Sequence, residues 1–75
     1  MARISQDKAF LKAFGKRLRS LRRKKGMSQL RLARLSQISP RFIIYMEKGE
    51  RNLTLLVLKD LAKGLGTTPR QVLPF

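Results

Sequence analysis

Apolar residues recur along the chain at the spacing of an α-helix, in short runs separated by glycine, proline and hydroxyl residues. No run alternates between apolar and polar residues for long enough to predict a β-strand. Serine and threonine favour helix starts, because their oxygens accept hydrogen bonds from the free N–H groups of the first turn. Glycine favours helix ends, because it adopts the left-handed conformation easily. The pattern predicts five short helices and an all-α fold.

The first predicted helix starts near Ser5 and stops at Gly26. Asp7 stands in its first turn, where negative charge suits the helix dipole. Gly15 weakens the middle of this segment, so the ordered helix could also begin only there. One apolar stripe, with helical spacing, consists of Phe10, Phe14, Leu18 and Leu21.

The other four predicted helices are shorter, and each begins at a serine or threonine. In the third, Pro40 follows the capping residue Ser39, at a position where its missing N–H costs nothing. The expected ranges are 28–35, 39–49, 54–65 and 68–73. Residues expected to face the core are Leu32, Ala33, Leu35, Ile43, Met46, Leu55, Leu58, Leu61, Ala62 and Leu65.

Length and composition favour a binding protein over an enzyme. A chain of 75 residues makes one small domain, which buries only about 60% of the surface that the unfolded chain exposes. The absence of cysteine and histidine excludes disulfides, zinc fingers and Ser-His-Asp catalysis. Four acidic residues in so small a chain leave little room for a catalytic pocket. We therefore expect no catalytic residue, metal, cofactor or small-molecule substrate.

The charge balance points to a polyanionic partner. The chain carries 18 Lys and Arg against 4 acids, a formal charge of +14, which favours nucleic acid or an anionic membrane surface. No apolar run approaches the roughly 20 residues of a membrane span, and the first residues lack the apolar segment of a secretory signal. We expect a cytoplasmic or nucleoid-associated protein. Seven basic residues fall within positions 16–25, and we interpret them mainly as a long-range field.

Two predicted helices lie unusually close, because their caps Ser28 and Ser39 are only eleven residues apart. The major groove of DNA, about 12 Å wide, admits one helix, and the preceding helix can brace it against the backbone. Two short helices joined by a tight turn solve this docking problem. The pattern therefore predicts that the third helix enters the groove.

This segment resembles the helix-turn-helix family of the Cro and phage-repressor type. The matching residues are Gly26-Met27-Ser28-Gln29, Leu32-Ala33, Ile38-Ser39, Ile43 and Met46-Glu47-Lys48-Gly49, and residues 61–73 match the last helices of the family. The resemblance implies a compact five-helix, lambda-repressor-like fold and a sequence-specific DNA-binding transcriptional regulator. It assigns residues 15–73 to the DNA-binding domain and residues 1–14 to a partly helical extension. The family usually has glycine at the turn, where this chain has Gln37. The loop 51–55 is similar to that of restriction–modification controller proteins.

Glu47 is the only acid between Lys8 and Gly49. A free carboxylate beside a phosphate-binding surface would repel DNA, so we expect it to be paired or to face the N4 group of a cytosine. The resemblance implies that it pairs with Arg22 and locks the third helix onto the first.

The resemblance also implies which residues contact DNA. Arg41 is the best candidate for a bidentate contact with guanine. Ile44 and Tyr45 suit a thymine methyl and a phosphate or base, although they could instead form a self-association patch. Gln29 suits a phosphate at a helix N-terminus, and Asn52 suits a phosphate or a plain turn. The predicted DNA-binding residues are Ser28, Gln29, Ser39, Pro40, Arg41, Ile44, Tyr45, Lys48, Arg51, Asn52 and Thr54.

One recognition helix reads too few base pairs for useful specificity in a genome. We therefore expect a homodimer on a roughly palindromic operator. Its interface is expected among the apolar residues late in the chain, Val57, Val72, Leu73 and Phe75. Two alternatives remain open: an antitoxin-like interaction module that also binds DNA for autoregulation, and a basic membrane-surface peptide, which the well-patterned core disfavours.

Overall fold

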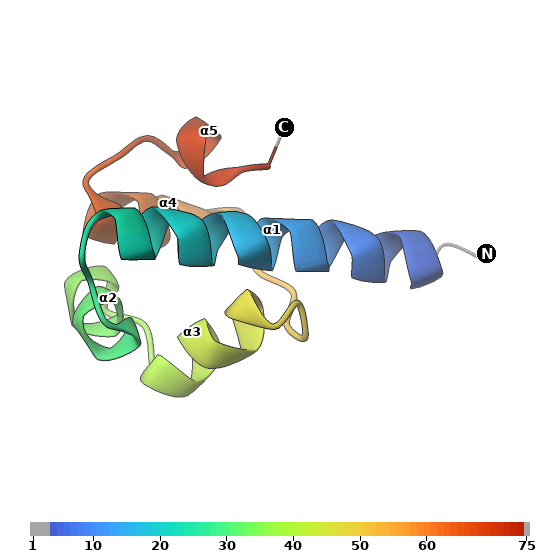
Figure 1. The fold of residues 1–75 in the computed structure, drawn as a ribbon, viewed down its shortest axis with the longest axis horizontal. Helices are drawn as coiled ribbons and strands as arrows, with labels where there is room; N and C mark the ends of the chain where they lie inside the picture. Colours follow the sequence, from blue (N-terminus) through green and yellow to red (C-terminus); the bar gives the residue numbers. More distant parts are fainter. Residues whose placement is uncertain (1–3, 75) are drawn as a thin grey trace.

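The computed structural model describes the backbone of residues 4–74 and the side chains of residues 7–74. Within this range the fold is all-helical, with the elements α1 (Ile4–Lys24), α2 (Gln29–Ser36), α3 (Pro40–Glu47), α4 (Leu55–Leu65) and α5 (Pro69–Val72). The predicted five-helix fold is confirmed. Figure 1 shows α1 as a long rod, with α3 on one side of it and α5 on the other. The α2 helix packs against α3 and α4, and α3 packs against α1, so the closely spaced pair of helices joins the rest of the fold through α1 and α4.

The α1 helix is continuous over 21 residues, and Gly15 does not interrupt it. Ser5 lies inside this helix rather than before it, and its side chain is outside the described residues. A Cβ atom at position 15 would lie 2.5 Å from the carbonyl oxygen of Met46. Contrary to the later helix start that the sequence suggested, α1 continues through Gly15, and the lack of a Cβ atom there lets α1 approach the end of α3. Neither α1 nor another described helix is long and apolar enough to cross a bilayer.

The predicted starts of the last four helices are confirmed, because four hydroxyl side chains accept hydrogen bonds from first-turn N–H groups. These caps are Ser28 for α2, Ser39 for α3, Thr54 for α4 and Thr68 for α5. Between α2 and α3, Gln37 adopts the left-handed conformation with φ 57° and ψ 40°. It is the one residue other than glycine with positive φ in the described range. This conformation costs roughly 1–2 kcal/mol for a residue with a Cβ atom.

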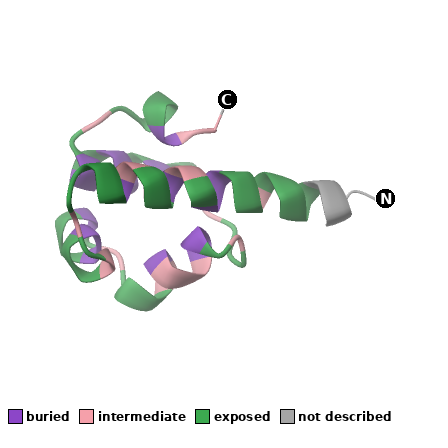
Figure 2. Cartoon of the chain, viewed as in Figure 1, coloured by how far each residue is buried: buried purple, intermediate pink, exposed green. Residues whose placement is uncertain are grey.

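One hydrophobic core joins all five helices (Figure 2). Full burial of each large aliphatic side chain contributes about 1.5–3 kcal/mol relative to an exposed one. The buried apolar residues are Phe14, Leu18, Leu32, Ala33, Ile43, Met46, Leu58, Leu61, Ala62, Leu65 and Val72.

Two residues predicted for the core are instead exposed, Leu35 at 41% and Leu55 at 83%. Leu55 begins α4, and the buried side of that helix starts one turn later. In α2, the inward position next to Leu35 is taken by a small polar residue, Ser36. The apolar stripe of α1 is also shorter than expected, since Phe10 is 49% exposed.

Candidate nucleic-acid interface

The turn between α2 and α3 fixes the two helices relative to each other. The Ile38 N–H donates to the carbonyl of Ala33 at 3.0 Å, which closes α2. The Ser39 hydroxyl then accepts from the Phe42 N–H at 3.1 Å and opens α3. Only residues 37–39 separate the helices. The arrangement is a helix, a tight turn and a second helix of equal length.

The α3 helix turns one face to the core and leaves the other outward. Ile43 and Met46 are fully buried. The start of the helix is exposed at Pro40 and Arg41. Ile44 and Tyr45, expected on the outward face, are half-buried. The exposed start and the half-buried middle of α3 are visible in Figure 2.

Tyr45 and Arg51 form a contact that the sequence did not reveal. The guanidinium carbon of Arg51 lies 5.6 Å from the centroid of the Tyr45 ring, within the range of a cation–π interaction. Both residues line a hollow of about 240 Å³ together with Ser39, Arg41 and Phe42. Two guanidinium groups therefore flank one hollow on the outer side of α3, an arrangement that suits a partner rich in hydrogen-bond acceptors. The contact depends on the path of the loop after α3, which no local sequence pattern specifies.

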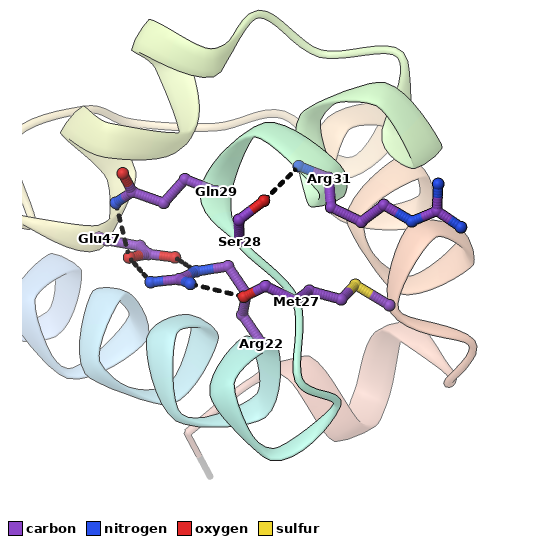
Figure 3. A network of polar contacts seen from close by, with 6 residues as sticks. All are labelled: Arg22, Met27, Ser28, Gln29, Arg31 and Glu47. Atoms are coloured by element: carbon purple, nitrogen blue, oxygen red, sulfur yellow. Dashed lines mark hydrogen bonds and ion pairs between the residues drawn. The ribbon is translucent and has the colours of Figure 1, made fainter.

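The expected ion pair between Arg22 and Glu47 is present (Figure 3). Arg22 Nε donates to Glu47 Oε2 at 2.6 Å, and Arg22 Nη2 donates to Glu47 Oε1 at 3.0 Å. The third guanidinium nitrogen, Nη1, donates to the carbonyl of Met27 at 2.8 Å. Glu47 is 9% exposed, so the alternative in which it faces a cytosine is not what the structure shows.

Gln29 belongs to the same network, which sequence reasoning missed. Its Nε2 donates to Glu47 Oε1 at 3.1 Å, as Figure 3 shows. The carboxylate of Glu47, on α3, therefore accepts hydrogen bonds from Arg22 of α1 and from Gln29 of α2, and so links all three helices. The side-chain amide of Gln29, which we expected to meet a phosphate, is engaged within the protein. Three donors around Glu47 offset its negative charge next to a basic surface.

The residues after α3 serve the local fold. Asn52 Oδ1 accepts from the Leu53 N–H at 2.9 Å, the turn role that was one of its two expected roles. Thr54 Oγ1 accepts from the Val57 N–H at 3.1 Å and caps α4. The expected phosphate ligands Lys48 and Arg51 are exposed.

The basic run 16–25 is not only a solvated face. Arg17 Nε donates to the carbonyl of Gln71 at 3.0 Å and ties α1 to α5. Arg22 is buried in its ion pair. The remaining basic residues of the run are exposed, and these can supply the expected long-range field.

The sequence profile of the helix-turn-helix family matches residues 18–72. The chain belongs to the helix-turn-helix family, in its Cro and phage-repressor branch. Proteins of this family bind double-stranded DNA and regulate transcription. The family thus consists of regulators rather than enzymes, as the composition predicted.

Individual helix-turn-helix relatives agree with this assignment. The chain is 34% identical to an uncharacterized HTH-type transcriptional regulator, y4dJ, of Sinorhizobium fredii, over 85% of this chain and 91% of the relative. It is 35% identical to the control protein C.BamHI of Bacillus amyloliquefaciens, over 83% of this chain and 78% of the relative. Among solved structures, the restriction-modification controller protein C.AhdI from Aeromonas hydrophila superposes with a TM-score of 0.84 at 42% identity, covering 85% of this chain and 97% of that chain.

In this helix-turn-helix motif, α2 is the bracing helix and α3 occupies the position of the recognition helix. The structure brings Ser39, Arg41, Tyr45 and Arg51 of the predicted set together around one hollow. Gln29 is instead linked to Glu47, and Asn52 and Thr54 make the local contacts described above.

Proposed function

We propose that this protein is a sequence-specific transcriptional regulator that binds a roughly palindromic operator as a homodimer. The observation that carries the proposal is the outer side of α3, where Arg41 and Arg51 flank a hollow beside an exposed helix start. The acid of α3, Glu47, is buried and paired. The described residues that line the hollow include two arginines and no acid, which suits a polyanion. A DNA target puts the site of action in the cytoplasm.

The predicted contacts to which we assign individual roles lie on α3 and directly after it. Arg41, near the exposed start of α3, donates to guanine O6 and N7 in the major groove. Ile44 packs on a thymine methyl, Tyr45 contacts a phosphate or a base, and Lys48 and Arg51 bind phosphates after α3. We assign residues 15–73 to the DNA-binding unit and residues 1–14 to its extension. The remaining members of the proposed contact set are Ser28, Gln29, Ser39, Pro40, Asn52 and Thr54.

The proposed dimer surface lies at the start of α4. Leu55 and Leu56 are 83% and 67% exposed. Leu55 lines a hollow of about 400 Å³ whose described lining residues include Asp7 but neither lysine nor arginine. Two chains of charge +14 meet with least repulsion where positive charge is missing. A second copy is therefore the occupant that we assign to this surface.

This surface replaces part of the interface that the sequence suggested. Val72 is fully buried and unable to meet a partner. Val57 and Leu73 are half-buried, and Phe75 lies outside the described residues. Leu55, in contrast, was expected in the core and now becomes an interface residue.

The relatives suggest which kind of system this protein regulates. The 42% identity with the controller protein C.AhdI and the form of the loop 51–55 support a role as a controller of a restriction–modification system.

Selection of bound duplexes from a random pool, followed by sequencing, tests the proposed function. We expect enrichment of an inverted repeat by the wild-type protein. The matched variant Arg41→Ala/Arg51→Ala, checked for unchanged helicity, should lose the enriched sequence but keep weak salt-sensitive binding. A wild-type pool without any enriched sequence would overturn the proposal.

A further inference from the structure

The first half of α1 lies outside the part of the chain that the family profile matches, which begins at residue 18. Phe14 is the first buried apolar side chain of α1 in the described range. Residues 4–13 span about 15 Å of helix, at 1.5 Å per residue, and their described side chains are exposed apart from the half-buried Leu11. Figure 2 shows this exposed part of the helix running beyond the other elements. Asp7, Phe10 and Leu11 of this segment line the hollow at the start of α4, and its basic side chains call for another explanation.

A basic hollow lies where this part of α1 meets the turn after α3. Its volume is about 480 Å³, and its lining residues are Lys8, Leu11, Lys12, Lys48, Gly49 and Glu50. All three lysines are exposed. Three lysines against one glutamate leave a local charge of +2 (3 − 1). We refer to these six residues as the lysine hollow.

Two glycines fix the position of the lysine hollow relative to the recognition helix. Gly49 has φ +75°, and a Cβ atom there would lie 2.8 Å from the Cα atom of Lys12. One turn further along α1, Gly15 lies against the carbonyl oxygen of Met46. These close contacts hold Lys12 at a constant offset from the end of α3. The lysine hollow therefore keeps a fixed position relative to any surface that α3 binds.

The lysine hollow is also one end of a basic stripe on α1. Helical spacing places five exposed basic residues within about 80° of one another around the helix axis, at 100° per residue. They are Lys8, Lys12, Lys16, Arg19 and Arg23. A stripe of one sign along a helix matches the linear charge of a nucleic-acid backbone.

We propose that the lysine hollow binds the DNA backbone outside the base pairs read by α3. Lysine suits this task, because its ammonium group is a hydrated point charge on a flexible stem and needs no fixed geometry. Such contacts position the protein on the duplex and add affinity, but they carry no sequence information. The proposal rests on the proposed function and adds to it a flanking phosphate contact made by the extension of α1.

The test compares two duplexes that carry the same selected operator. One ends at the outer edges of the half-sites, and the other continues for about six base pairs of arbitrary sequence on each side. The added length exceeds the extension of α1, because about 15 Å corresponds to roughly four base-pair steps of 3.4 Å. The measurement is Kd as a function of salt concentration for each duplex.

Wild-type protein should bind the longer duplex more tightly and with a steeper dependence of log K on log salt. Lys12→Gln should reduce the slope by about 0.9 per protomer on the longer duplex, the value of one phosphate contact, and leave the shorter duplex unchanged. Glu50→Gln should strengthen binding to the longer duplex only. The control Lys63→Gln removes the same charge from the exposed side of α4 and should retain the wild-type difference.

Equal wild-type slopes on the two duplexes would overturn the flanking contact while leaving the proposed function intact. Equal effects of Lys12→Gln and Lys63→Gln on the salt dependence would also overturn the flanking contact, because the change would then depend only on the total charge of the protein. Failure of the wild-type protein to bind either duplex would overturn the proposed function and the flanking contact together.

Discussion

Ser36 of α2 lies directly against Gly64 of α4. A Cβ atom at position 64 would collide with the Ser36 hydroxyl and lie 3.1 Å from the Ser36 backbone nitrogen. Ser36 is 4% exposed, and its Oγ has no hydrogen-bond partner within the part of the chain that the structure describes. Two small residues thus allow α2 and α4 to approach closely, and this contact holds the helix-turn-helix motif on the rest of the core.

Gly64→Ala should lower the free energy of unfolding by about 1–3 kcal/mol, the usual cost of overpacking. Ser36→Ala should stay within about 1 kcal/mol of the wild type, because it removes a buried hydroxyl without a partner. Urea unfolding measures both. The double variant Ser36→Gly/Gly64→Ala should recover part of the loss, and strictly additive effects would show that the two positions do not press on each other.

Glu47→Ala should lower the melting temperature far more than it changes nonspecific DNA affinity. The substitution leaves Arg22, which is 8% exposed, as a buried charge without its carboxylate, at a cost of up to about 3–5 kcal/mol. Glu50→Ala removes an exposed carboxylate and serves as the control in thermal unfolding. A Glu47→Ala protein that melts like the wild type would show that the network does not brace α3.

Gln37→Gly should raise the free energy of unfolding by about 0.5–1 kcal/mol. Relief of the left-handed strain at φ 57° is worth roughly 1–2 kcal/mol, and the greater flexibility of unfolded glycine offsets part of this gain. Gln37→Val should instead lower the free energy of unfolding. The urea midpoints of the two variants decide the matter, and a destabilised Gln37→Gly would mean that the Gln37 side chain contributes more than its backbone costs.

Arg41→Ala should weaken operator binding by about 1–3 kcal/mol at one or two base-pair positions and relax the preference there. Arg51→Ala should instead weaken binding to all sequences to a similar extent, because we assign it to a phosphate. Binding-site profiles from selection experiments distinguish the two patterns. An unchanged profile would remove Arg41 from the residues that read bases.

Tight operator binding should need two protomers with half-site centres about 34 Å apart. An insertion of five base pairs between the half-sites rotates one of them to the far side of the duplex and should abolish the tight complex in gel shifts. Leu55→Gln/Leu56→Gln should weaken the two-protomer complex, whereas Leu35→Gln, at another exposed leucine, should not. A tight one-to-one complex that ignores the spacing would contradict the dimer.

Local signals in the sequence predicted the helix starts well, because a capping hydroxyl such as that of Ser28 or Ser39 bonds within its own turn. The resemblance to the Cro and phage-repressor family implied the Arg22–Glu47 pair, whereas the isolated acid alone indicated only that Glu47 would be paired or would face a cytosine. Leu55 was assigned wrongly to the core. The helical spacing of apolar residues identifies a helix, but it does not specify at which turn the helix begins to pack against the other helices.

The missed contacts share a physical cause. The hydrogen bond from Gln29 to Glu47 and the stacking of Arg51 on Tyr45 both join residues that tertiary packing brings together. Gly15 was read as a weak point because glycine lowers helix propensity. Its role became visible only when α3 was found against it. Propensity describes a helix in isolation, and these residues act between helices.

The contact at Gly15 sets backbone against backbone, with no side chain whose rotamer could adjust. The recognition helix therefore has little freedom to tilt on the rest of the protein. In the proposed complex, any misfit between two rigid protomers and their half-sites must be accommodated by the duplex. DNA bends most easily at pyrimidine–purine steps. Base pairs between the half-sites, which no side chain reaches, would then influence the choice of operator through their stiffness alone.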